Sequence, residues 1–247
     1  MKYASLFIVA LPALLMAENS AEYRNRKAFE AETEVEQKQI HAIRECAVSK
    51  IQSCVYPLLA NLKKEGKENV TLRRESANAL GRLRAPEARE PLLALLPKET
   101  DMQVKQAIVR AIGLIGNKAD VKAIAPFLAD NDVAMRRAAA RAMFDMDDKT
   151  ASTEAGGKIS NEKDDLTRAE LISAALQNEG GKVEYAIALS KILLSQDRAA
   201  RLRTAEVMAL YKNKEVLSDL ERAMSTERDP EVRAAIHHAI QATTFGN

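Results

Sequence analysis

The apolar residues of this chain recur at three- and four-residue spacing, and short turns interrupt them at regular intervals. Two neighbouring stretches show this spacing: Ala77, Leu80 and Leu83, then Ile108, Ile112 and Ile115. Such spacing places each set on one face of a helix, so each stretch predicts a helix with one buried stripe. Turns at 84–86 and 116–118 follow the two stretches. The pattern therefore predicts successive short helices joined by tight turns.

Each predicted unit opens with the same five-residue phrase, an Asn or Asp followed three residues later by an aliphatic residue and four residues later by a base. The clear copies are Asn69 with Arg73, Asp101 with Lys105, Asp132 with Arg136, and Asp229 with Arg233. The first three copies begin 32 and 31 residues apart, and the long interval before the last divides into three similar steps. The Asn or Asp side chain is expected to cap the first helix, because the leading N–H groups of a helix lack partners within it.

Weaker copies of the phrase fall where the period predicts them. Asp164 with Arg168 lies one step past Asp132, Leu202-Arg203 has Ala199 in place of the acid, and Ile40-His41 precedes the first clear copy. A second signature is a proline before an apolar run, at Pro57, Pro91 and Pro126. Proline near a helix start removes no internal hydrogen bond, so it indicates the second helix of each unit. A repeat of this length predicts an all-α fold, an α-solenoid (superhelix) of about seven helical hairpins, some of them degenerate.

Two runs, Ala77–Gly81 and Asp229–Arg233, resemble HEAT repeats, in particular the short variety found in bilin lyases of light-harvesting complexes. The resemblance covers roughly residues 37 to 242. It implies that the caps and bases form a polar ladder between repeats rather than a binding stripe. The ladder residues are Asn69, Arg73, Asp101, Lys105, Asp132, Arg136, Asp164, Arg168, Asp229 and Arg233.

The repeat pattern divides the chain into segments. Residues 18–36 are highly charged with a thin apolar face, which predicts a helical extension before the repeats at 37–145. Residues 146–163 are polar and contain Gly and Ser, so we expect a flexible loop there, because such a run buries little apolar surface. This loop could serve as a solvated linker or as a partner-binding loop. A metal-binding loop is the least favoured role, because the Gly and the terminal Glu of an EF-hand are missing. Further repeats are expected over 164–247.

The first residues predict a signal peptide. Lys2 is followed by an apolar stretch over 6–16, then by Ala17 and an abrupt polar switch. The stretch is shorter than the ~20 residues that a membrane-spanning helix needs. We expect cleavage after Ala17, with Ala21 a second choice, an uncleaved anchor as the alternative, and no integral membrane span in the mature chain. The protein is therefore expected to be exported, to the periplasm or the medium.

Export changes the expectation for the only two cysteines, Cys46 and Cys54. On one continuous helix, residues eight apart would be separated by ~12 Å, too far for a disulfide. Alignment on the prolines instead places Cys46 near the end of a first helix and Cys54 near the start of a second. We therefore expect a disulfide across this turn, with two buried thiols as the alternative.

The net charge of the chain does not indicate a particular partner, but the charged residues are unevenly distributed. Without the signal peptide the chain carries 36 bases and 35 acids. Between residues 62 and 141 there are 16 Lys and Arg against 10 Asp and Glu. Such a block is expected to solvate helix faces or, alternatively, to attract an anionic partner. Nucleic acid is disfavoured, because Trp is absent and only 4% of residues are aromatic, whereas single-strand binders stack bases on rings.

Catalytic chemistry finds little support in the sequence. The histidines are His41, His237 and His238, and the chain contains no Gly-x-Ser-x-Gly, no phosphate-binding Gly-rich loop and no His-Glu-x-x-His. One HEAT-like enzyme family holds a di-iron centre through His-Glu pairs, which this sequence lacks. We expect no cofactor and no enzyme activity. The leading hypothesis is an exported scaffold, monomeric or part of a hetero-complex, that binds a protein or peptide in a groove of stacked second helices. The alternatives are a bilin-lyase-like or other ligand-handling enzyme and a structural envelope component.

Overall fold

The computed structural model describes residues 21–179 and 182–245, and this part of the chain is all helical, with no β-strand. The α-helices are α2 (Ala21–Val48), α3 (Val55–Leu62), α4 (Val70–Leu83), α5 (Arg89–Leu95), α6 (Met102–Ile115), α7 (Val121–Ile124), α8 (Val133–Met146), α9 (Lys149–Gly156), α10 (Asp165–Glu179), α11 (Val183–Ile192), α12 (Arg198–Tyr211), α13 (Leu217–Thr226) and α14 (Pro230–Phe245). Short 3-10 helices, η1 to η7, join many of them. The predicted signal peptide lies outside the described residues.

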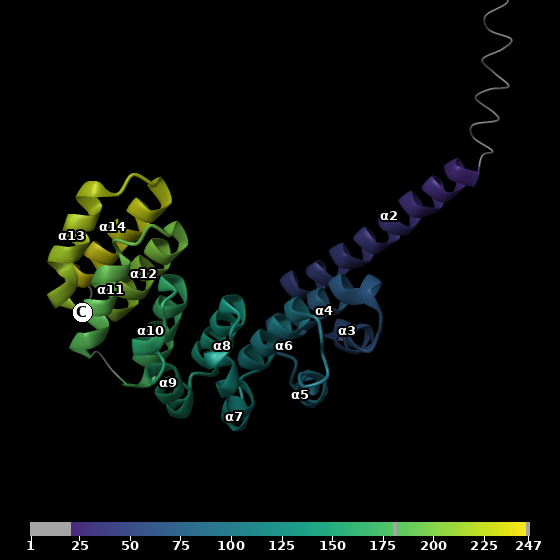
Figure 1. Ribbon diagram of the computed structural model, residues 1–247, viewed down its shortest axis with the longest axis horizontal. Helices are drawn as coiled ribbons and strands as arrows, with labels where there is room; N and C mark the ends of the chain where they lie inside the picture. Colours follow the sequence, from purple (N-terminus) through teal and green to yellow (C-terminus); the bar gives the residue numbers. More distant parts are fainter. Residues whose placement is uncertain (1–20, 180–181, 246–247) are drawn as a thin grey trace, which may run out of the picture.

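The helices form six hairpins, α2/α3 to α12/α13, and α14 is the first helix of a seventh unit. First helices stack on first helices, α4 on α6, α6 on α8 and so on to α14, and the stack curves into an arc (Figure 1). The first helices line the inner side of this arc, whereas α5, α7 and α9 lie on its outer side. The α-solenoid predicted from the repeat is confirmed.

The charged extension and the first helix of the first hairpin are one continuous helix, α2, which projects beyond the arc. None of the described helices combines the length and the apolar character needed to cross a membrane.

Most first helices end in the same way. The residue after α4, α6, α8 and α12 adopts the left-handed conformation, at Arg84, Gly116, Asp147 and Lys212 respectively. This ending turns the chain sharply and satisfies helix carbonyls. The second helices vary more, since Pro57 and Pro91 lie inside α3 and α5, whereas Pro126 lies in the 3-10 helix η5 just after α7. The hairpins thus share a uniform inner helix and a variable outer one.

Glycines let neighbouring inner helices approach one another closely. A Cβ added at Gly81 would lie 2.7 Å from the Cα of Ala111, and one added at Gly113 would lie 2.5 Å from the Cα of Ala142. Both distances are far below van der Waals contact, so backbone packs directly on backbone between α4, α6 and α8. The positions twelve residues after the next two caps carry Phe144 and Leu176 instead.

The prediction of a flexible loop over residues 146–163 is wrong. Asp148 caps α9 by accepting from the N–H of Thr150, and η6 (Ile159–Asn161) follows. Ala151, Ser152 and Ala155 are fully buried, and the Ser152 hydroxyl donates to the Ala174 carbonyl of α10 over 2.8 Å. Small side chains let α9 lie close against α10, so little large apolar surface is required. This segment is the second helix of the fourth hairpin.

Cys46 and Cys54 form a disulfide, with Sγ atoms 2.02 Å apart and Cα atoms 6.2 Å apart. Cys46 lies near the end of α2 and Cys54 ends η1 (Gln52–Cys54), so the bond spans the turn between α2 and α3. This is the hairpin arrangement expected from the proline alignment. The bond closes the first hairpin, which has one neighbouring hairpin to pack against.

Candidate functional site

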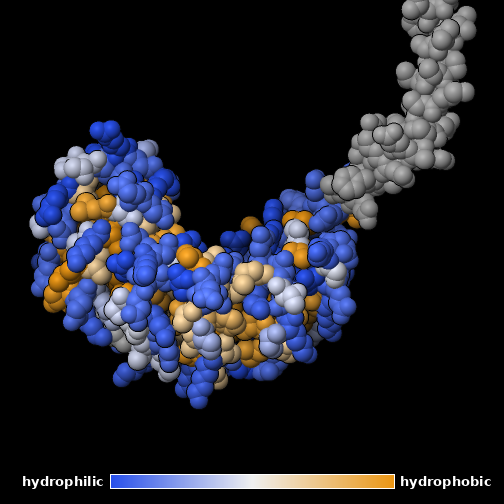
Figure 2. Space-filling model, in the orientation of Figure 1, coloured by the Kyte–Doolittle hydropathy of each residue, from blue (hydrophilic) through white to orange (hydrophobic). Residues whose placement is uncertain are grey.

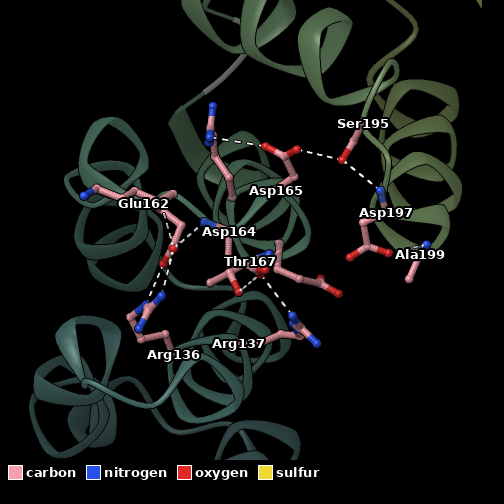
Figure 3. Close-up of polar contacts among 12 residues, drawn as sticks. Arg136, Arg137, Glu162, Asp164, Asp165, Thr167, Ser195, Asp197 and Ala199 are labelled. Carbon is pink, nitrogen blue, oxygen red and sulfur yellow. Dashed lines mark hydrogen bonds and ion pairs between the residues drawn. The ribbon is translucent and has the colours of Figure 1, made fainter.

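The cap and ladder residues lie at the junctions between hairpins. Asp101 accepts from the N–H groups of Gln103 and Val104, and Asp132 accepts from Met135. Asp164 accepts from the N–H and hydroxyl of Thr167 (Figure 3), and Asp229 from Glu231 and Val232. The cap prediction is wrong for Asn69, whose amide instead donates to the Glu65 carbonyl and to the Glu68 carboxylate, because 3-10 helix η2 (Lys67–Asn69) precedes α4.

The junctions contain a carboxylate that sequence reasoning missed. The Nε–H groups of Arg73, Arg136 and Arg201 donate to Glu99, Glu162 and Glu227 over 3.0, 2.7 and 2.6 Å, and each guanidinium makes a second bond to the same carboxylate. The other guanidinium nitrogen of each arginine donates to two carbonyls of the loop before its own helix. The available signal was Glu-x-Asp, which ends on a cap acid at 99–101, 162–164 and 227–229.

Each of these glutamates also fixes the backbone of the next helix start. One oxygen of Glu162 accepts from the N–H groups of Lys163 and Asp164 at 2.9 and 2.8 Å, and Glu99 and Glu227 bind their following residues in the same way. Burial raises the pKa of Glu162, but the hydrogen bonds from Arg136 and these amides outweigh it and lower the pKa overall. Hydrogen bonding from Arg201 lowers the pKa of Glu227. The Glu162 and Glu227 carboxylates thus stay ionised at neutral pH, where they hold the junctions together.

The ladder is discontinuous. Within the described residues Lys105 has no ion pair, and Arg168 pairs only within its own helix, with Asp165 at 3.3 Å. Arg233 donates to two carbonyls, of Met224 and Glu227. The prediction for the sixth unit is out of register by two residues. Asp197 caps α12 and Arg201 is its ladder base, so Ala199 is not at the cap position. The misassignment arose because Leu202-Arg203 happens to resemble the phrase.

The groove predicted on stacked second helices lies instead on the first helices. The inner side of the arc is a broad hollow with a largely hydrophilic surface (Figure 2), and its hollows are lined from α4, α6, α8, α10 and α12. Groove-facing residues recur at fixed offsets from the caps, for example nine residues after each: Asn78, Arg110, Arg141, Ser173 and Glu206. The hydrophobic period could not distinguish inner from outer helices, because both bury one face.

The first part of the groove is a basic hollow of about 350 Å³ over α4, α6 and α8. Four arginines, three amide side chains and three alanines line it, and no acidic residue does; they are Arg74, Arg110, Arg137, Arg141, Asn78, Gln103, Gln106, Ala107, Ala134 and Ala138. Burial, together with repulsion from the Arg141 and Arg82 charges, lowers the pKa of Arg110. Arg110 and Arg82 have no hydrogen-bond or ion-pair partner among the described residues. Arg74, Arg137 and Arg141 each have a carboxylate partner, so Arg110 is the arginine of this hollow whose charge no ion pair neutralises within the described residues.

The second part of the groove is an apolar hollow of about 370 Å³ over α8, α10 and α12. Its lining residues are Phe144, Ser173, Leu176, Gln177, Val207, Leu210 and Tyr211, and Leu210 is 68% exposed. It lies where Phe144 and Leu176 replace the close-packing glycines of the earlier helices. A mixed-charge surface joins the two hollows, since it shares Arg110 and Arg141 with the first and Phe144 with the second. On that surface Glu170 binds both Arg141 and Arg203, at 2.7 and 3.0 Å.

The histidines do not assemble a site. His237 and His238 are exposed on α14, and His41 is exposed on α2. In the part of the chain that the structure describes, no three His, Cys, Asp or Glu side chains are grouped as metal ligands.

Comparison with known families identifies a repeat in part of the chain. The family model described as HEAT repeats matches residues 90–176. A search of curated proteins finds no match. Among solved structures, the crystal structure of an engineered protein is 22% identical, with a TM-score of 0.45, covering 76% of this chain and 96% of that one. Human deoxyhypusine hydroxylase in complex with glycerol is 17% identical, with a TM-score of 0.34, covering 86% of this chain and 87% of that one.

Proposed function

This chain is a HEAT-repeat protein, and from that premise we propose that it is an exported, non-catalytic scaffold that binds another protein or a peptide in the groove of its first helices. The observation that carries the proposal is that the polar side chains fall into two groups, those bonded at the junctions between hairpins and those left without a bond in the groove. Ladder residues such as Arg136 and Glu162 are hydrogen-bonded to each other between hairpins. Groove residues such as Asn78, Arg82 and Arg110 have no side-chain hydrogen bond among the described residues and face solvent across the arc.

The shape of the groove supports a macromolecular ligand. Its two hollows and the surface between them extend over five consecutive first helices, α4 to α12. Small-molecule sites are usually single concave pockets that enclose most of the ligand, whereas stacked repeats build long open surfaces. A partner lying along the arc would contact several hairpins at once.

Export is supported by two independent features. The apolar stretch over 6–16 has the length and flanks of a signal peptide. The Cys46–Cys54 disulfide suits an oxidising compartment. The mature chain is expected to begin at Glu18, which N-terminal sequencing of protein recovered outside the cytosol would show. A mature protein that retains Lys2 would contradict cleavage.

Site-specific photocrosslinking in the producing cells tests the binding surface. A photoreactive residue at Ala134, which is exposed in the basic hollow, should crosslink to one discrete protein. The matched control places the same residue at Lys122, exposed on α7 on the outer side of the arc, and should give no such product. Equal products from both positions, or none from Ala134, would refute the groove as the binding surface. A chromophore that copurifies with the protein would instead favour the lyase alternative.

A further inference from the structure

The basic hollow has the composition of a carboxylate-binding surface. Its arginines come from three successive first helices, with Arg74 on α4, Arg110 on α6, and Arg137 and Arg141 on α8. Amide side chains from α4 and α6 lie between them, and the alanines leave room for a ligand to approach the helices. Arginine offers planar paired donors that match a carboxylate, and amides donate to and accept from a peptide backbone.

Part of this positive charge is available to a ligand. Arg137 shares one bond of 3.0 Å with Asp164, and its buried Nε–H has no partner among the described residues. Arg74 donates to the neutral Gln103 and also to Glu75. Arg110 has no hydrogen-bond or ion-pair partner there; it is repelled by Arg141 and Arg82 and attracted, without an ion pair, by Asp145 and Glu170, and desolvation together with the repulsion outweighs that attraction. An incoming anion would therefore relieve repulsion among these arginines without breaking a junction between hairpins.

We propose that the groove binds an acidic, extended protein segment, with its carboxylates over α4, α6 and α8. This inference rests on the proposed function and names the chemistry of the partner. Packed helices lie about 8–10 Å apart, and an extended chain in the polyproline II conformation advances about 3.1 Å per residue with three residues per turn, so every third side chain points to the same side. Carboxylates on every third residue therefore match the spacing of the helices that carry the arginines.

The rest of the groove favours a protein segment over a nucleic acid. No aromatic ring lines the basic hollow, so bases would find no stacking surface. Beyond it, Asp145, Glu170 and Glu206 interrupt the basic surface, so a continuous polyphosphate chain would find no unbroken basic path along the groove. The apolar hollow at Phe144, Leu176 and Leu210 lies further along the same surface. An acidic stretch followed by an apolar residue has the order of chemistry that the groove presents.

The test uses the full mature chain and a fluorescent peptide with a glutamate at every third position and a leucine at one end. Its control peptide carries glutamine in place of each glutamate. The glutamate peptide should bind, and added salt should weaken binding, because charge attraction in an exposed groove is screened. Arg110→Gln should weaken binding about tenfold, the loss expected for one hydrogen-bonded charge pair. Lys122→Gln removes the same charge from the outer side and should leave affinity unchanged.

Folding is separated from binding in the same variants. Arg110→Gln should unfold at the same urea concentration as the parent or a slightly higher one, since it removes a repelled charge. Equal binding of the two peptides, an unchanged affinity in Arg110→Gln, or tighter binding of a single-stranded oligonucleotide would each overturn the inference. If Ala134 crosslinks to a partner while the glutamate peptide fails to bind, the scaffold function stands and the acidic segment does not. If neither occurs, both proposals fall.

Discussion

Replacing Gly113 with alanine should destabilise the protein, although alanine favours a helix. Gly113 lies inside α6, and an added Cβ would lie 2.5 Å from the Cα, 2.6 Å from the Cβ and 2.9 Å from the carbonyl oxygen of Ala142 on α8. Carbon atoms pack best at about 3.5–4.0 Å. Two of these three neighbours are backbone atoms, so no rotamer change removes the clash and α6 must move away from α8 by about 1 Å.

The magnitude follows from two opposing terms. Overpacking a well-packed core costs about 1–3 kcal/mol, and a clash with backbone belongs at the upper end of that range. Alanine offsets about 1 kcal/mol of this cost through its helix propensity. The free energy of unfolding should therefore fall by about 2 kcal/mol. Urea unfolding followed by far-UV circular dichroism measures it, with the slope m compared between variants because repeat arrays need not unfold in one step.

Gly157→Ala is the matched control. Gly157 follows α9 with φ −64°, and a Cβ there would have its nearest neighbour at 3.5 Å. The same chemical change should thus be neutral or stabilise by about 0.4–1 kcal/mol, by restricting the unfolded chain. A Gly113→Ala variant that is as stable as the parent, or stabilised to the same extent as Gly157→Ala, would refute direct backbone packing between α6 and α8.

Further tests address the junctions, the disulfide and α9. Glu162→Gln should lower the free energy of unfolding at pH 7 by about 3 kcal/mol, because it leaves Arg136 without its charged partner; Glu154→Gln, at an exposed position on α9, should change it little. Folding lowers the pKa of Glu162, so the stability that its carboxylate contributes is complete above its unfolded pKa of about 4.3. That contribution is lost as the pH falls through the lower folded pKa. In acid unfolding titrations the parent should therefore lose its advantage over Glu162→Gln. Reduction should add 2 Da per disulfide to the intact mass and cost about 2–3 kcal/mol, and two thiols that alkylate freely without reductant would contradict the Cys46–Cys54 bond. Deleting residues 151–158 should cost more than about 3 kcal/mol, since it removes buried packing against α10; a thermal midpoint unchanged by the deletion would show that α9 is dispensable.

The repeat could be predicted from the sequence because its signals are local. A cap such as Asp101, Asp132 or Asp164 binds N–H groups two or three residues away, so its chemistry is visible in a short window. The buried stripes of the first helices are likewise set by helical period alone. The cysteine pairing was accessible too, because both partners belong to one hairpin whose turn the proline spacing located.

The errors share a physical cause. Residues 149–156 contain few large apolar side chains, and only contact with α10 shows that Ala151, Ser152 and Ala155 are buried by close approach. The ladder glutamates are 26 residues from their arginines, so the pairing depends on how one hairpin stacks on the next. Glu-x-Asp was present in the sequence, but composition cannot distinguish a buried carboxylate from an exposed one.

The groove was decided by tertiary structure alone. An excess of bases over residues 62–141 is visible in the sequence, but its members divide between junctions, outer helices and the inner surface. Arg73 and Arg74 are adjacent, yet the first is 8% exposed and bound to Glu99 while the second lines the groove. A helix turns by about 100° per residue, so neighbouring side chains point to different surroundings. Which of those surroundings is a junction and which is open solvent depends on the curvature of the whole stack.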